Sequence, residues 1–294
     1  MNRLSIEDRA KIVRLLVEGN SLRSTSRITN IHIDSITKVL VQVGKACQKF
    51  HDETVINIKS AKIQCDEIWS FVQCKEANTQ YCKKNGKEHI GDAWIWVGID
   101  ADTKLVVSWL VGDRSPECAH DFMYDVKSRL ANRVQLTTDG FREYIPAVKD
   151  AFNYDVDYAM EIKTYGTSEG NTDTERKYSP ATVKSVKKIR VFGAPNEDDI
   201  STSYAERQNL TMRMGMRRFT RLTNAFSKKI ENHGYAIAMH YVYYNFVRKH
   251  TTLRVTPAMA AKLTDRFMTI DDMVRIAYAD EIASENKRLA RMYR

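Results

Sequence analysis

The chain has 294 residues, with 46 lysines and arginines against 37 acids and a net charge of +9. This length allows a sizeable core plus one or two small modules, and the hydrophobic share of 43% is typical of a globular protein. The positive charge favours a polyanionic partner. No CxxC pair occurs among the five cysteines, which argues against a disulfide framework or a zinc ribbon.

No segment has the pattern of a leader or a membrane span. The start, "MNRLSIEDRAK", has no apolar core of the signal-peptide type, and the most apolar run, "AWIWVGI", is too short to cross a bilayer. We therefore expect a protein of the cytoplasm, associated with the nucleoid and not with a membrane.

The first 48 residues predict a helix, a short helix, a tight turn and a third helix. Ser5 is a good N-cap for "IEDRAKIVRLLV", Gly19 ends that helix, and Ser21 begins the next. Asn30 suits the turn because it tolerates left-handed backbone. This order is typical of a helix-turn-helix DNA-binding domain, with a generic three-helix bundle as the alternative. The residues expected on the groove side are His32, Asp34, Ser35 and Lys38.

From residue 62 the pattern alternates as in strands. "KIQCDEIWSFV" predicts a strand, a polar loop with exposed Lys83, Lys84 and Lys87 follows, and "AWIWVGIDADTKLVVSWLVGDR" predicts a hairpin whose turn is shaped by Asp100 and Asp102. A helix capped by Ser115, with Pro116 at its first position, precedes the buried strand "RVQLTTDG" and the short helix "FREYIPAVKDAF". These elements predict a mixed α/β sheet flanked by helices.

Residues 153–200 read as an inserted block, with strands over "VDYAMEIKTYG" and "VKKIRVFG" and a polar loop, "TSEGNTDTERKYSP", between them. Helices are predicted after this block: one from near Ser203, a long one over "SKKIENHGYAIAMHYVYYNFVRKH", a short one capped by Thr256, and a last one over "TIDDMVRIAYADEIASENKRLARMYR". The predicted domains are a helix-turn-helix (1–48), a linker (49–61), a catalytic domain (62–250) and a C-terminal helical segment (251–294).

Three acidic residues occupy positions in the predicted elements that suit a metal site. Asp66 lies within a strand, where an ionised acid is costly unless it is paired or binds metal. Asp139 lies at the carboxyl end of another strand, a common place for ligand groups. Glu206 lies in the first turn of a helix. If the two strands are neighbours and the helix packs across them, three carboxylates converge into a site suited to Mg²⁺.

Each acid has an alternative interpretation. Glu67 is the rival of Asp66, and strand alternation places it on the other face of the sheet. Asp139 could simply form an Asp-Gly turn, and Ser203-x-x-Glu206 fits a capping box. The acids that compete with Glu206 inside the long gap before it are Glu161, Glu169, Glu175 and Glu197.

The basic segment, defined as residues 207–229, carries seven basic residues and no acid. A solvated helix face without acids lacks stabilising ion pairs, so phosphate binding explains this composition better. The residues expected to contact DNA are His32, Ser35, Lys38, Arg207, Arg213, Arg217, Arg218, Arg221, Lys228, Lys229, Arg248 and His250. A plain helix end is the alternative for the last two, and His120, His233 and His240 are expected to be structural.

Three blocks, "CDEIWSFV", "LTTDGFREY" and "STSYAERQNLTMRMGMRRFTRLTNAFSKK", resemble the signature blocks of the insertion-sequence-one family of DDE transposases. The run "YNFVRKHTTLRVTPAMAA" resembles the end of many DDE transposase cores. The resemblance extends over about residues 62–262. It implies a ribonuclease-H-like core with Asp66, Asp139 and Glu206 as catalytic metal ligands, Glu206 being favoured because it alone lies in the ERQN context.

The resemblance also implies an activity. A transposase of this family binds the terminal inverted repeats of its element, cuts a phosphodiester with water and joins the freed 3′-hydroxyl to target DNA. The expected cofactor is Mg²⁺, with Mn²⁺ as a substitute, and the expected partners are double-stranded DNA and further copies of the chain in a homodimer or larger assembly. The alternatives are a ribonuclease-H-like nuclease or resolvase without joining activity, and a DNA-binding regulator derived from a transposase.

Overall fold

A computed structural model describes residues 3–82, 91–166, 182–220 and 223–284. The chain forms two compact units, and each is described by itself. The first unit comprises Met1–Ile56, Ile68–Ile95 and Gln208–Arg294, and the second comprises Asn57–Glu67 and Trp96–Arg207. Several sequence predictions lie outside the described residues: those for Lys83, Lys84, Lys87, Glu169, Glu175 and Arg221, and the loop that begins at residue 167.

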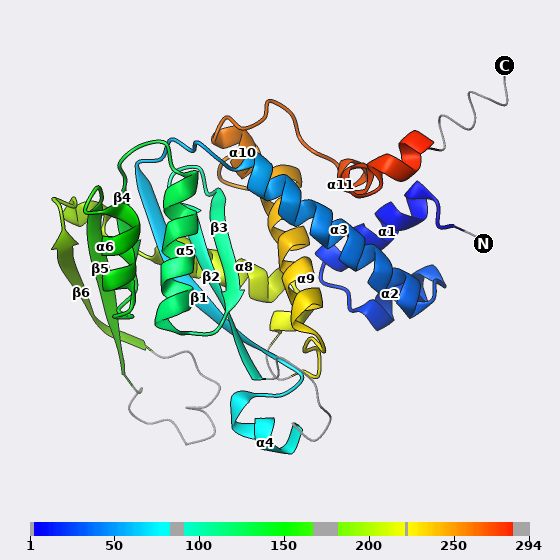
Figure 1. Ribbon diagram of the computed structural model, residues 1–294, viewed down its shortest axis with the longest axis horizontal. Helices are drawn as coiled ribbons and strands as arrows, with labels where there is room; N and C mark the ends of the chain where they lie inside the picture. The colour runs from blue at the N-terminus through cyan, green and yellow to red at the C-terminus, as the bar shows by residue number, and fades with distance from the viewer. Residues whose placement is uncertain (1–2, 83–90, 167–181, 221–222, 285–294) are drawn as a thin grey trace. The chain divides into compact units, whose positions relative to one another are not determined.

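The strands form one six-stranded sheet in the order β3-β2-β1-β4-β5-β6 (Figure 1). β4 is parallel to both β1 and β5, and β6 is antiparallel to β5. A mixed sheet flanked by helices confirms the predicted α/β class. The strands are β1 (Lys62–Val72), β2 (Gly91–Asp100), β3 (Val106–Gly112), β4 (Gln135–Thr138), β5 (Asp157–Gly166) and β6 (Thr182–Phe192).

In the second unit, α5 (Pro116–Arg129) and α6 (Tyr144–Phe152) pack together beside the sheet. Ser115 caps α5 by accepting the N–H of Cys118 at 3.2 Å, as predicted. The core between helices and strands is aromatic: the fully buried Trp96 ring lies 5.9 Å from that of Phe122 and 5.4 Å from that of Tyr144. These contacts hold α5 and α6 against β2.

The turn between β2 and β3 is held by one carboxylate. Asp100 Oδ1 accepts the N–H groups of Asp102 at 2.8 Å and Thr103 at 2.7 Å. Asp100 is almost completely buried. Its oxygen therefore satisfies two turn amides, which confirms the expected role of this residue in shaping the turn.

In the first unit, α1 (Ile6–Val17), α2 (Leu22–Thr29) and α3 (Ile33–Thr54) follow the predicted caps, and Asn30 is left-handed with φ of 56°. α3 continues six residues past the predicted boundary at residue 48. It does so because Val43, Cys47 and His51 continue one buried face at intervals of four residues. Part of the predicted linker is therefore helical, and the domain boundaries themselves remain a prediction.

The remaining helices of the first unit pack on α3. α9 (Ile230–Val242) approaches it so closely that a Cβ on Gly44 would lie 2.4 Å from the Cβ of Tyr235, so this position needs glycine. The predicted long helix is interrupted, because a π-helical turn (Tyr243–Val247) follows α9. The other elements are η1 (Glu76–Asn78) and α4 (Thr79–Cys82), both in a predicted loop, η4 (Arg217–Phe219), α10 (Pro257–Ala260) and α11 (Ile270–Ala277). No helix in the described ranges is long and apolar enough to cross a membrane.

Candidate active site

Strand register brings Asp66 and Asp139 together in the second unit. β1 and β4 run parallel with Gln64 opposite Thr137, a separation of 73 residues (137 − 64). Asp66 and Asp139 are separated by the same 73 residues, and each lies two positions beyond this pair. Because neighbouring strands lie about 4.8 Å apart, this register sets the two carboxylates side by side at the carboxyl end of β4.

Glu67 joins them although it lies, as strand alternation predicts, on the side of the sheet that carries Cys65 and Tyr144. Asp66, Glu67 and Asp139 each offer a carboxylate oxygen, and these oxygens all lie within 4.8 Å of one another. β4 ends at Thr138. The long Glu67 side chain can therefore reach past the end of the strand to Asp139. We call these three residues the acid cluster.

Arg114, which follows β3, supplies positive charge to the acid cluster. Its Nη2 lies 3.1 Å from Glu67 Oε2 and 3.6 Å from Asp139 Oδ2, and its guanidinium lies over the Phe141 ring. The Glu67 side chain is only 2% exposed. Although the Tyr144 hydroxyl adjoins Glu67, neither it nor Glu67 Oε1 has a partner with hydrogen-bond geometry among the residues that the structure describes. A buried carboxylate oxygen without a partner is costly, and a cation would satisfy it.

The negative charges of the acid cluster repel one another. Burial raises the pKa of Glu67 to about 8, and repulsion from Asp139 adds to the shift. Burial also raises the pKa of Asp139, and the negative charge of Glu206 acts in the same direction. Arg114 and the N–H of Phe141, which donates to Asp139 Oδ1 at 3.0 Å, only partly oppose these effects. The local field therefore favours binding of a further cation.

Glu206 is positioned by β1 through the start of α8 (Ser203–Gly215). Gln64 Oε1 on β1 accepts the N–H of Tyr204 at 2.8 Å and that of Ala205 at 3.4 Å. Ser203 is the first helical residue, and the N–H of Glu206 bonds to the Thr202 carbonyl at 2.9 Å. The capping-box interpretation is therefore wrong, because a side chain from the sheet binds the first amides of the helix.

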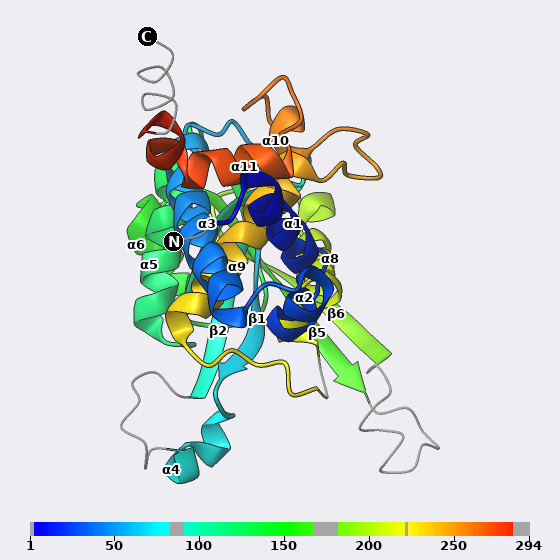
Figure 2. The same ribbon diagram turned by 90° about the vertical axis from the view of Figure 1, so that its right-hand side faces the viewer.

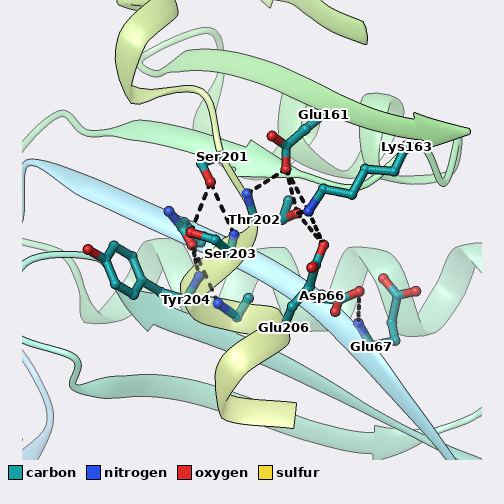
Figure 3. A network of polar contacts seen from close by, with 11 residues as sticks. Asp66, Glu67, Glu161, Lys163, Ser201, Thr202, Ser203, Tyr204 and Glu206 are labelled. Atoms are coloured by element: carbon teal, nitrogen blue, oxygen red, sulfur yellow. Dashed lines mark hydrogen bonds and ion pairs between the residues drawn. The ribbon is translucent and has the colours of Figure 1, made fainter. Parts of the chain in front are cut away.

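The Glu206 carboxylate is held by Lys163 and lies outside the acid cluster. Figure 3 shows Lys163, on β5, between the carboxylates of Glu161 and Glu206. Lys163 Nζ lies 3.1 Å from Glu161 Oε2, and the Thr202 hydroxyl lies 2.8 Å from both carboxylates. The sequence analysis missed Lys163 and treated Glu161 only as a competitor. The alternation of β5, which places both on one face, was the available signal.

The predicted DNA-contacting residues differ in their surroundings. The basic segment is not one helix, because α8 ends at Gly215 and the short helix η4 follows. Arg218 donates from Nη1 to Ser227 Oγ at 2.7 Å and to the Asn232 carbonyl at 3.0 Å, which gives it a packing role. His32, Lys38, Arg207, Arg217, Lys228, Lys229 and Arg248 are exposed, whereas Ser35, Arg213, Arg218 and His250 are partly buried.

Comparison with known proteins does not assign the chain to a family. No family model matches the chain, and no significant match occurs among curated proteins. Among solved structures, the piggyBac transposase synaptic complex with hairpin DNA is similar at 10% sequence identity and a TM-score of 0.40, over 98% of this chain and 73% of that one. Similarity at this level carries no argument about fold or function.

Proposed function

We propose that this chain is a DDE transposase similar to the insertion-sequence-one family, with a ribonuclease-H-like core that cleaves and joins DNA. The observation that supports the proposal is that acids from two signature blocks meet within one unit, while Glu206 from the third lies on the helix whose start is held by Gln64 of β1. Asp66 and Asp139 are in the acid cluster, whereas the Glu206 carboxylate lies outside it and pairs with Lys163. The strand order β3-β2-β1-β4-β5, with β1, β4 and β5 parallel, supports the core assignment.

The residues present fit a hard divalent cation. The donors are all carboxylate oxygens, and buried Glu67 Oε1 has no hydrogen-bond partner. Asp66 and Asp139 would hold Mg²⁺, or Mn²⁺ in its place, with Glu67 and Glu206 as the remaining ligands. When bound, such ions activate the attacking oxygen and stabilise the leaving oxygen of an in-line phosphoryl displacement.

Basic side chains and the N-terminal helices would support the metal site and bind the DNA. Lys163 orients Glu206, and Arg114 limits the repulsion within the acid cluster. The exposed arginines and lysines of the basic segment would hold DNA phosphates. The helices of residues 1–48 would bind the terminal inverted repeats. Because two element ends must be paired, a homodimer or larger assembly is the expected working form.

The test uses double-stranded DNA that carries the inverted repeats flanking the gene. Asp66→Asn, Asp139→Asn and Glu206→Gln should each abolish Mg²⁺-dependent cleavage and joining while leaving end binding intact. Glu197→Gln, which changes an exposed acid of the same unit, is the matched control and should stay active. Normal joining by any of the three variants would remove that residue from the proposed site.

Two outcomes with the wild-type chain would favour the alternatives. Hydrolysis of pre-cut ends without any joined product would favour a nuclease or resolvase. Binding of DNA without cleavage, together with the absence of inverted repeats around the gene, would favour a regulator. Pre-cut ends isolate the joining step, so this assay separates all three classes.

A further inference from the structure

The two strands of the predicted insert continue beyond their neighbour in the sheet. β4 pairs with β5 only from Asp157 to Met160. β5 continues to Gly166 and pairs with β6 along this extension, as Figure 2 shows. We call residues 161–166 and 182–190 the β5–β6 ribbon. β6 is the last strand of the sheet, so no strand of the described residues pairs with its outer edge.

The ribbon is strongly basic and exposed. It carries five basic side chains, Lys163, Lys184, Lys187, Lys188 and Arg190, against one carboxylate, Glu161. The side chains of Val183–Lys188 are all exposed, and the apolar members Val183 and Val186 are 46% and 49% accessible. The ribbon therefore combines positive charge with open β-strand surface.

Part of this charge has no partner among the described residues. Arg190 pairs with Glu197 at 3.2 Å, and Lys188 Nζ donates to the carbonyl of Glu197 at 2.7 Å. By contrast, Lys184 and Lys187 have no carboxylate partner within the part of the chain that the structure describes. Within the described ranges, two exposed ammonium groups thus remain available to a ligand.

The ribbon begins at the candidate active site. Glu161 lies opposite Lys188, and Lys163 lies opposite Val186 across the two strands. The same Lys163 contacts the Glu206 carboxylate. A ligand bound along the ribbon would therefore be continuous with a substrate positioned at the acid cluster.

Two kinds of partner could bind the ribbon, a second copy of the chain or DNA, and the positive charge of the ribbon favours DNA. An open strand edge can pair with a second copy of the chain, but exposed lysines oppose such pairing because like charges would face one another. A two-stranded ribbon fits the major groove of DNA, and lysines bind its phosphates as counterions. We propose that the β5–β6 ribbon is a DNA-binding arm whose lysines hold the backbone of the duplex beside the candidate active site. The assignment of that duplex as substrate rests on the proposed function.

Binding is measured by fluorescence anisotropy with a labelled duplex of mixed sequence, in metal-free buffer and in an Asp66→Asn background. Lys184→Ala/Lys187→Ala should weaken binding and make the slope of log K against log salt shallower by about 0.9 for each lost phosphate contact. The matched control, Lys59→Ala/Lys149→Ala, removes two other exposed lysines of the same unit and should leave the slope unchanged. Lys184→Arg/Lys187→Arg should retain the wild-type slope.

An alanine variant with the slope of the control would overturn the proposal. So would sedimentation showing that the wild type self-associates through this edge and that the alanine variant self-associates more tightly without any change in slope. Because the measurement needs neither metal nor catalysis, failure of the strand-transfer assay would leave a positive result intact. The two proposals can therefore fail separately.

Discussion

Two groups of buried polar side chains in this molecule differ in whether their hydrogen bonds are complete. The first is the acid cluster of the second unit. The other is a network in the first unit, which we call the His233 network: Arg218, Ser227, His233 and Ser70. There Arg218 donates to Ser227, whose Oγ lies 2.8 Å from His233 Nδ1, and His233 Nε2 lies 3.0 Å from Ser70 Oγ.

The hydroxyl and imidazole protons of the His233 network all have acceptors. Ser70 donates its hydroxyl proton to the Ala93 carbonyl at 2.8 Å, so Ser70 Oγ must accept from His233 Nε2–H. His233 Nδ1 then accepts from Ser227, whose Oγ accepts from Arg218. Burial lowers the pKa of His233 to about 3, so the ring is neutral at ordinary pH.

The acid cluster has the opposite character, with an unpartnered Glu67 oxygen and pKa values raised by burial and mutual repulsion. The comparison shows how a buried polar group that stabilises the fold differs from one that serves a function. We infer that the hydrogen bonds of the His233 network stabilise the fold, whereas the unpartnered Glu67 oxygen, set among like charges, is the place of a cation from outside. Three substitutions test this contrast.

The largest effect on stability is expected in the His233 network. His233→Ala removes the donor to Ser70 Oγ and the acceptor of the Ser227 hydroxyl proton and opens a cavity, so the free energy of unfolding should fall by about 2–4 kcal/mol. Urea denaturation measures this change. His120→Ala, at a partly exposed histidine, should change stability by no more than about 0.5 kcal/mol. Equal effects of the two substitutions would mean that the network contributes nothing specific.

Glu67→Gln should stabilise the protein in EDTA, and only at high pH. The pKa of Glu67 is raised from 4.5 to about 8, so between these values the folded state holds a proton that the unfolded chain has released. Wild-type stability is therefore lost as pH rises through this window. The gain from Gln should be near zero at about pH 4.5 and about 1–4 kcal/mol at about pH 9.

Thermal unfolding at the two pH values provides the measurement for Glu67→Gln. Glu197→Gln is the control, because its carboxylate is 67% exposed and should show no such dependence. Destabilisation of equal size at both pH values would show that the Glu67 carboxylate is a satisfied structural group, and the contrast with the His233 network would be lost.

The smallest effect is expected at Lys163. Lys163→Met leaves Glu161 and Glu206 without their shared cation, but buried Glu161 keeps two hydrogen bonds from Thr202 and Glu206 is 42% exposed, so the loss in EDTA should be about 1 kcal/mol. Because a bound divalent ion would give Glu206 a new positive partner, Mg²⁺ should restore the melting temperature. Lys127→Met, which breaks a pair with Asp155 at 3.6 Å, should gain nothing from Mg²⁺. The same Mg²⁺ response in both variants would contradict the role given to Lys163.

Much of the fold follows from local patterns in the sequence. β1 has the predicted bounds, and Ser5, Ser21 and Ser115 cap their helices as predicted, because a cap depends only on residues a few positions away. The separation of 73 residues between Asp66 and Asp139 can also be read directly from the sequence. Its meaning became clear only with the parallel register of β1 and β4, in which partners are separated by the same number of residues.

The rest depends on tertiary contacts that no local pattern encodes. Alternation placed Glu67 on the face opposite Asp66, but it cannot tell that β4 ends beside Glu67 and so lets its side chain reach the same cluster. The role of Lys163 depends on where β5 lies relative to α8, and the start of α8 is held by Gln64, which lies about 140 residues earlier. The side chains that adjust the acids of the site were therefore harder to predict than the acids themselves.

The central claim is that Asp66, Asp139 and Glu206 form one divalent-cation site. Anomalous diffraction from crystals soaked in Mn²⁺ tests it most directly, without reference to activity. We predict an anomalous peak bonded to the carboxylates of Asp66 and Asp139, with Glu206 released from Lys163 toward it, and no such peak in Asp139→Asn crystals. Saturating Mn²⁺ that leaves these carboxylates without a peak would contradict the account.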